Sequence, residues 1–151
     1  MDVAFRFACS SDCQSASDLV SRCTSKNIAP TLNTGALELL LQSMTPAETR
    51  KRLDDGWPHL MAEQNGVLVG VGVLRPPSHL YHLYVDAQCQ HRGLGTQLFE
   101  KLEQIAVSRC QSTIITVNAS LNAVDFYCRL GFVSRGSVVN FNGIRFQPMT
   151  R

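Results

Sequence analysis

The segment QHRGLGTQLFEKL, residues 90–102, constrains the fold of this chain most, because it places two glycines where one kind of secondary structure gives way to another. Residues 79–87 before it, HLYHLYVDA, are rich in the Leu, Tyr and Val that favour a β-strand. From Leu98 onward, apolar residues recur at the spacing of an amphipathic helix. The first turn of that helix therefore falls at Gly93 and Gly95, where its free backbone N–H groups lie.

This order of strand, glycines and helix is suited to binding an anion. The free N–H groups and the dipole of a helix N-terminus attract negative charge, and glycines let a phosphate approach the backbone closely. A Walker A loop would need Gly-Lys-Ser/Thr, which the segment lacks, and a dinucleotide fingerprint would need glycine in place of Leu98. The remaining interpretations are a different phosphate-bearing ligand, or glycines that simply ease the turn from strand to helix.

Composition limits the classes of protein. With 151 residues, 44% of them hydrophobic, the chain has the size and apolar content of one domain, and we predict a single domain over residues 1–151. A net charge of +2 with 17% charged residues gives no broad basic face, which argues against nucleic acid as a partner. The sequence shows no signal peptide and no bilayer-spanning apolar run, so we expect a cytoplasmic protein without a membrane partner.

The six cysteines are scattered along the chain. They form no CxxC pair and no zinc-type spacing with histidine, so we expect no metal site. Free cysteine packs as a small hydrophobic residue, and we predict reduced and mostly buried thiols.

Capping, turn and periodicity signals predict the other elements. The Asn-Gly dipeptides at 65–66 and 142–143 each favour a tight hairpin between two strands. The remaining expectations are a strand at 3–7, a helix from Ser10 or Ser11 to Cys23, a loop at 24–35, a short apolar segment at 37–41, a helix capped by Thr45 and ending at Gly56, a buried strand at 113–117, and a helix capped by Ser120 or Asn122 and ending at Gly131. Strands and helices mix without strict alternation, which predicts a mixed α+β sheet.

The strand after the first hairpin carries an unusual pattern. Every second residue from Val67 to Val73 is valine, and these valines are expected on one face, with Gly70 and Gly72 on the other. Glycines inside a strand mark places where another backbone or a ligand comes close.

Three segments together resemble the acetyl-coenzyme A binding core of the Gcn5-related N-acetyltransferase (GNAT) superfamily. These are HLYHLYVDA, QHRGLGTQLFEKL and NAVDFYCRLGF, and the tail NGIRFQPM is similar to the ends of many small single-domain bacterial members. The resemblance extends over residues 62–149. It implies an α+β GNAT fold, with a central, mixed, mostly antiparallel twisted sheet of about seven strands flanked by about four helices.

The resemblance also implies a coenzyme site for acetyl-CoA as cosubstrate. Main-chain N–H groups of the glycine segment are expected to wrap the pyrophosphate, and the strand at 83–85 is expected to pair with the pantetheine arm, with an N–H near Leu83 polarising the thioester carbonyl. Ser120 stands where many members carry asparagine. The implied coenzyme residues are Leu83, Tyr84, Val85, Gln90, His91, Arg92, Gly93, Leu94, Gly95, Thr96, Ser120, Asn122, Phe126 and Tyr127.

Catalytic roles follow from the same resemblance. Tyr127 matches the tyrosine that protonates the departing thiolate, and packing is the alternative role. His79 stands where a family glutamate base would be, so it is the first candidate base and His82 the second; a surface or hydrogen-bonded role is the alternative for each.

The implied activity is direct acetyl transfer to a primary amine in a ternary complex, to a small molecule in preference to a protein. The alternative is a non-catalytic acyl-CoA-binding regulatory module. A homodimer through the final strands is expected by analogy with the family.

Overall fold

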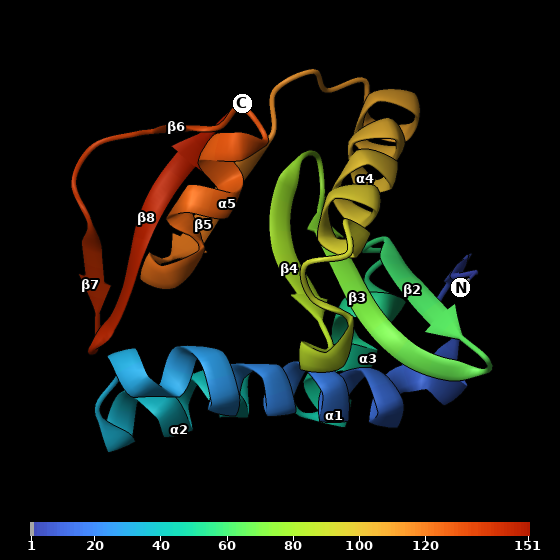
Figure 1. Cartoon of the computed structure of the whole chain (residues 1–151), viewed down its shortest axis with the longest axis horizontal. Helices are drawn as coiled ribbons and strands as arrows, with labels where there is room; N and C mark the ends of the chain where they lie inside the picture. The colour runs from blue at the N-terminus through green and yellow to red at the C-terminus, as the bar shows by residue number, and fades with distance from the viewer. Residues whose placement is uncertain (1) are drawn as a thin grey trace.

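The computed structural model describes residues 2–151 and contains one eight-stranded sheet in the order β1-β2-β3-β4-β5-β8-β6, with β7 also paired to β8 (Figure 1). The strands are β1 (Ala4–Phe7), β2 (His59–Gln64), β3 (Val67–Arg75), β4 (His79–Val85), β5 (Thr116–Ser120), β6 (Val133–Ser134), β7 (Val139–Phe141) and β8 (Ile144–Thr150). The β4–β5 pair is parallel and the other described pairs are antiparallel. The predicted mixed, mostly antiparallel sheet is confirmed.

Helices cover both faces of the sheet. They are α1 (Cys13–Cys23), α2 (Thr34–Gln42), α3 (Pro46–Asp54), α4 (Leu94–Cys110) and α5 (Val124–Arg129). In Figure 1, α1, α2 and α3 lie along the bottom of the molecule, and α4 and α5 lie above them. The core is accordingly divided into a cluster that includes α4 and one that includes α1.

The glycines of β3 let α4 lie close against the sheet. A Cβ added at Gly70 would lie 2.9 Å from Leu98 Cδ1, and one added at Gly72 would lie 2.6 Å from Leu102 Cδ1. The partner that approaches these glycines is therefore a pair of helix side chains. This contact fixes α4, and so its N-terminus, relative to the sheet.

Gly72→Ala is expected to destabilise the chain by overpacking this contact. Leu102 is only 1% exposed, so its side chain has little room to move away from an added methyl group. Overpacking of this kind costs about 1–3 kcal/mol in free energy of unfolding, which urea denaturation would measure. Gly35→Ala is the control, because its Cβ would meet only Asn33 Oδ1 at 3.7 Å. A Gly72→Ala chain as stable as the wild type would contradict the packing described.

A β-bulge overturns the predicted face pattern of β3. Leu68 pairs with Glu63 and Gly70 pairs with Ala62, so Val69 is an extra residue without a partner in β2. Val69 packs in the α4 cluster, whereas Val71 and Val73 pack in the α1 cluster. The prediction that these valines share one face was wrong because the bulge reverses the alternation.

The predicted Asn-Gly turns at 65–66 and 142–143 and the predicted helix cap at Thr45 are confirmed. Asn65 and Asn142 have φ values of 53° each, and each precedes a glycine with positive φ, as a tight hairpin requires. The Thr45 side chain accepts a hydrogen bond of 3.2 Å from the Glu48 N–H at the start of α3. Gly56 and Gly131 have positive φ beyond the ends of α3 and α5.

Two segments differ from the prediction because contacts with distant parts of the chain determine their secondary structure. The expected loop at 24–35 continues α1 as a π-helical turn (Thr24–Ile28) and a 3₁₀ turn (Ala29–Thr31), and α2 then begins at Thr34 behind an Asn33 cap. The strand expected at 113–117 lies instead at Thr116–Ser120, in register with β8.

The helix expected to start at Ser120 or Asn122 also begins later. A 3₁₀ turn (Leu121–Ala123) precedes α5, and no side chain caps either element in the described chain. The Ser120 hydroxyl lies 2.7 Å from Asn122 Oδ1 and donates to it.

The cysteines are all free, but the prediction that most are buried was wrong. Cys13 and Cys23 are buried, while Cys9 and Cys128 are exposed and the other two are intermediate. Within residues 2–151, no group of three or more His, Cys, Asp or Glu is arranged to hold a metal ion. None of the helices described there has both the length and the apolar content that crossing a membrane requires.

Candidate functional site

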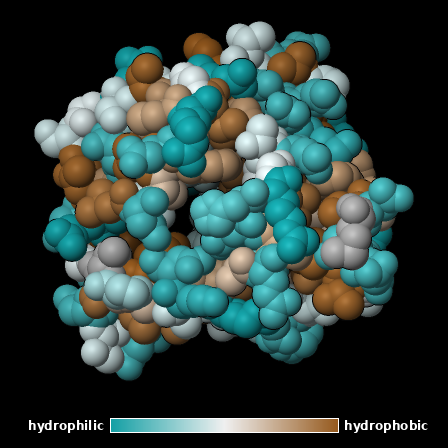
Figure 2. All heavy atoms as spheres, in the orientation of Figure 1, coloured by the Kyte–Doolittle hydropathy of each residue, from teal (hydrophilic) through white to brown (hydrophobic). Residues whose placement is uncertain are grey.

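The central strands β4 and β5 separate along most of their length. They pair only at His79 with Thr116 and at Leu80 with Val117. Beyond this point β4 continues beside β3 and β5 continues beside β8, so the sheet is open between them (Figure 1). A cavity of about 760 Å³ lies at this opening. Figure 2 shows the hollow, which is bordered mainly by hydrophilic residues.

The cavity brings together most of the predicted coenzyme residues. They come from β4, the segment before α4, the first turn of α4, the end of β5 and α5. The predicted residues that line the cavity are Leu83, Tyr84, Val85, Gln90, His91, Gly93, Leu94, Gly95, Thr96, Ser120, Asn122, Phe126 and Tyr127.

The N-terminus of α4 opens onto this cavity. Gly93 is the N-cap residue with φ 79° and ψ 5°, a left-handed conformation that glycine adopts without strain, and its position provides no side-chain cap. The N–H groups of Leu94, Gly95 and Thr96 precede the first bond of the helix, which Gln97 donates to Gly93 O at 3.0 Å. These uncapped donors and the helix dipole make this turn suited to an anion.

Gly95 lets the first turn of α4 lie close to α5 and β4. A Cβ at this position would lie 3.3 Å from Phe126 Cζ and 3.9 Å from Val85 Cγ2. A side chain here would therefore press against the Phe126 ring, which lines the cavity beside the helix N-terminus.

The glycine segment is held to β4 by Gln90. Its side-chain Nε2 donates to the Val85 carbonyl at 3.1 Å, and the Cys23 thiol donates to the same carbonyl at 3.5 Å. Because this carbonyl already has two donors, backbone pairing with a ligand is left to groups of β4 nearer Leu83.

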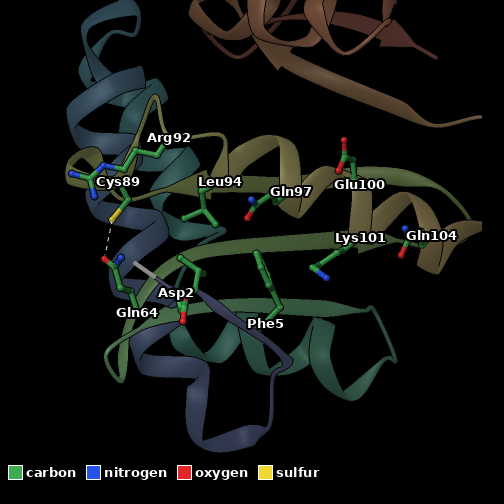
Figure 3. A pocket seen from close by; sticks show the side chains of 11 residues that line it. Asp2, Phe5, Gln64, Cys89, Arg92, Leu94, Gln97, Glu100, Lys101 and Gln104 are labelled. Atoms are coloured by element: carbon green, nitrogen blue, oxygen red, sulfur yellow. Dashed lines mark hydrogen bonds between the residues drawn. The ribbon is translucent and has the colours of Figure 1, made fainter.

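Arg92 lies apart from the other predicted coenzyme residues. It lines a separate groove of about 800 Å³, together with Phe5, Gln64, Cys89 and Lys101 among others. Figure 3 shows Arg92 beside Cys89 at one end of this groove. Leu94 lines both the groove and the cavity. Arg92 is the one predicted coenzyme residue, among those that the structure describes, that does not line the cavity.

Tyr127 is buried in α5 and lines the cavity. Its ring packs edge-on against Phe126 and Phe132, with centroid distances of 5.1 and 5.4 Å. Burial and the neighbouring Tyr84 raise the pKa of Tyr127 well above its ordinary value. The phenol is therefore neutral at neutral pH, and it holds its proton more tightly than a free tyrosine does.

Sequence reasoning missed several lining residues, which are Cys23, Asn27, Ile28, Ala123, Asp125 and Arg129. Asn27 and Ile28 belong to the segment expected as a loop, and Asn122 Nδ2 donates to Asn27 O at 2.8 Å across the site. Asp125 and Arg129 are spaced by four residues on α5, and this helical spacing was the available signal.

Neither candidate base reaches the cavity. His79 lies where β4 and β5 still pair, and its Nδ1 is 2.8 Å from Thr116 Oγ1; burial and Arg75 lower its pKa to about 4. His82 is 7% exposed and lines a different, small cavity beside α1 and α3. Burial, with Arg52 and His59, lowers the pKa of His82 to about 3.

The buried histidines are expected to make stability fall as the pH decreases. Because the folded-state pKa of His82 is lowered from 6.5 to about 3, the unfolded chain binds more protons below pH 6.5. The contribution of buried, neutral His82 to the free energy of unfolding is therefore fully present above pH 6.5, and it is lost as the pH falls below that value. His82 would lower the free energy of unfolding by about 2 kcal/mol between about pH 7.5 and pH 5. Urea denaturation at the two pH values measures this change, and equal stability at both would contradict the burial described.

An uncapped helix N-terminus beside an opened sheet defines a fold suited to an elongated, anionic ligand. The family model described as an acetyltransferase (GNAT) domain matches residues 28–151. The chain therefore belongs to the GNAT acetyltransferases, as the sequence resemblance predicted. No curated protein matches the chain significantly.

Solved structures of similar fold include three that are described as acetyltransferases or as bound to coenzyme A or acetyl-CoA. A protein from Rhodopseudomonas palustris, described as a GCN5-related N-acetyltransferase and as an aminotransferase of class II, is 28% identical, with a TM-score of 0.87 and coverage of 100% of this chain and 96% of that chain. The PaiA N-acetyltransferase of Thermoplasma acidophilum in complex with coenzyme A is 16% identical, with a TM-score of 0.78 and coverage of 100% and 99%. YncA of Salmonella typhimurium with its cofactor acetyl-CoA is 22% identical, with a TM-score of 0.70 and coverage of 100% and 94%. The last two likenesses show the fold.

Proposed function

We propose that this chain transfers the acetyl group of acetyl-CoA to a primary amine by direct attack in a ternary complex. The observation that carries this proposal is one cavity that joins the uncapped N-terminus of α4, the unpaired stretch of β4 and the phenol of Tyr127. The family and the coenzyme-bound structures of the same fold support acetyl-CoA as the cosubstrate.

The residues of the cavity fit this cosubstrate. The N–H groups of Leu94, Gly95 and Thr96 would hold the diphosphate, with Gly93 and Gly95 leaving the backbone open to it. Backbone groups of β4 near Leu83 would pair with the pantetheine arm, and the Leu83 N–H would polarise the thioester carbonyl. Asn122 and Phe126 line the remainder of the cavity.

Tyr127 would act as the general acid. The neutral amine forms a bond to the carbonyl carbon, and collapse of the tetrahedral adduct breaks the carbon–sulfur bond. The Tyr127 hydroxyl gives its proton to the leaving thiolate, and the proton released by the amine nitrogen restores the phenol. The products are an N-acetyl amine and free coenzyme A, so atoms and charge balance.

Deprotonation of an ammonium substrate is assigned to water in the cavity. An alkyl amine is mostly protonated at neutral pH, so a proton must leave before attack. His79 and His82 do not line the cavity, and burial, partial at His79 and nearly complete at His82, lowers the pKa of both. Their positions also keep the second candidate function open, a module that binds acyl-CoA without turnover and regulates a partner.

One experiment separates the two functions. Purified protein is mixed with acetyl-CoA and a panel of small primary amines, and released thiol is measured with a chromogenic disulfide. The enzyme hypothesis expects amine-dependent release at a saturable rate. Tight acetyl-CoA binding with no release above the hydrolytic background for any amine or peptide N-terminus would favour the binding module. The acceptor and a homodimer through the final strands stay predictions.

A further inference from the structure

Three buried nitrogen atoms outside the coenzyme site have no hydrogen-bond partner among the described residues. They are Arg52 Nε, His59 Nε2 and His82 Nε2. The three residues come from α3, β2 and β4 and are 8%, 2% and 7% exposed. Unpaired buried donors and acceptors are costly, so these atoms require a partner that the protein itself does not provide.

The three residues line one small cavity between the sheet and the helices α1 and α3. Its volume is about 10 Å³, which is room for one particle the size of a water molecule. The Thr49 hydroxyl already donates to Thr45 O at 3.0 Å. The remaining lining is apolar and comes from Ala16, Val20, Met44, Val71 and Val73. Arg52, His59 and His82 are thus the charged and titratable groups that face this space.

Hydrogen bonds made by the other ring nitrogen of each histidine decide whether its Nε2 is a donor or an acceptor toward the cavity. His59 Nδ1 is 2.6 Å from the Trp57 carbonyl, which can only accept, so Nδ1 carries the proton. Burial lowers the pKa of His59, and the neutral ring leaves Nε2 as an acceptor. The His82 ring likewise donates to the Tyr81 backbone, and burial keeps it neutral, so its unpartnered Nε2 is also an acceptor.

Arg52 supplies the complementary group. Its Nη1 donates to Ser43 O at 2.9 Å, and its Nε–H is the donor left without a partner. The ligand must therefore accept one hydrogen bond and donate two. A halide has no proton to donate to two imidazole lone pairs, and a cation would be repelled by the guanidinium.

We propose that a single water molecule is bound here, accepting from Arg52 Nε and donating to His59 Nε2 and His82 Nε2. The water joins α3, β2 and β4, and its binding does not depend on the proposed enzyme activity.

The site lies next to an irregularity in the strand that borders the coenzyme cavity. His82 pairs with Val73 and Leu80 pairs with Leu74, so Tyr81 is the extra residue of a bulge in β4. The Arg52 guanidinium lies 5.0 Å from the centre of the Tyr81 ring, so Arg52 contacts both the bulge and the water site. The bridged cluster therefore holds the bulge, whose extra residue lies two positions before Leu83. This consequence rests on the proposed function, in which Leu83 faces the thioester.

A crystal structure of the wild-type protein grown in sodium bromide tests the site. The expected result is one density peak within hydrogen-bond distance of all three nitrogen atoms, without anomalous bromine signal. A bromine signal at that position would make the site an anion site and overturn the proposal. An empty cavity would overturn it as well.

Two matched variants of α3 test the coupling to β4. Arg52→Met removes the donor to the water, whereas Arg50→Met removes an exposed arginine that pairs with Asp54 on the same helix. In NMR spectra of the folded proteins, the amide resonances of Tyr81, His82 and Leu83 are expected to shift in Arg52→Met and to stay in place in Arg50→Met. Arg52→Met is also expected to lower the Tm by about 5 °C. Unchanged β4 resonances in Arg52→Met would refute the coupling. Neither readout uses coenzyme or turnover, so failure here is distinct from failure of the proposed function.

Discussion

Gly95→Val is expected to raise the Kd for acetyl-CoA by about 100-fold or more. Gly95 lines the cavity at the α4 N-terminus, and even a Cβ there would lie 3.3 Å from Phe126 Cζ. The two methyl groups of valine extend further, so the diphosphate could not reach the N–H groups of the first turn. Loss of two hydrogen bonds to a charged group, each contributing about 1.5 kcal/mol or more, gives an effect of this size.

Isothermal titration calorimetry with acetyl-CoA measures this effect, and Gly35→Val is the matched control. Gly35 also lies in the first turn of a helix, α2, but it is exposed and does not line the cavity. The control is expected to bind with the wild-type Kd. If Gly95→Val kept the wild-type melting temperature and bound acetyl-CoA as tightly as the control, the first turn of α4 would not be the diphosphate site.

Tyr127→Phe is expected to lower kcat by about 100-fold. The Tyr127 phenol is neutral and lines the cavity, so it can give its proton to the thiolate as the carbon–sulfur bond breaks, although burial raises its pKa and makes it a weaker acid. General acids contribute about 10²–10⁴-fold, and the lower end applies because a coenzyme A thiolate leaves readily without help.

Coenzyme binding serves as the internal control for this variant. Phenylalanine retains the ring that packs against Phe126 and Phe132, so the Kd for acetyl-CoA is expected to stay within about threefold of the wild type. Steady-state kinetics with an accepted amine would measure kcat. An unchanged kcat would assign Tyr127 a packing role only.

Features set by neighbours in the sequence were predicted well. The positive φ of Gly93 marks the turn before α4, and the hairpin at Asn65-Gly66 and the cap at Thr45 follow from the conformations and hydrogen bonds that these residue types favour locally. The resemblance of the three quoted segments then led to the fold and the family.

Features set by distant partners were not predictable in the same way. Pairing with β8 places β5 at Thr116–Ser120, because the register of a strand depends on a segment far along the chain. The continuation of α1 depends on burial of Thr24, whose hydroxyl lies 3.3 Å from Met44 Sδ. Such contacts leave no mark on local residue patterns.

His82, one of the two candidate bases, shows the same limit. Alternation along HLYHLYV would place Leu80 and His82 on one face. The bulge at Tyr81 instead leaves Leu80 in the α4 cluster and His82 in the small cavity beside α1 and α3. A bulge depends on pairing with β3, so the face reached by His82 required the structure.

The central claim is that the first N–H groups of α4 hold the diphosphate of acetyl-CoA. An NMR titration of ¹⁵N-labelled protein tests it most directly, with acetyl-pantetheine, which lacks the nucleotide and its diphosphate, as the matched ligand. We predict saturable shifts of the Leu94, Gly95 and Thr96 amide resonances with acetyl-CoA and much smaller ones with acetyl-pantetheine. Resonances of these three amides that stay unmoved by saturating acetyl-CoA would contradict the account.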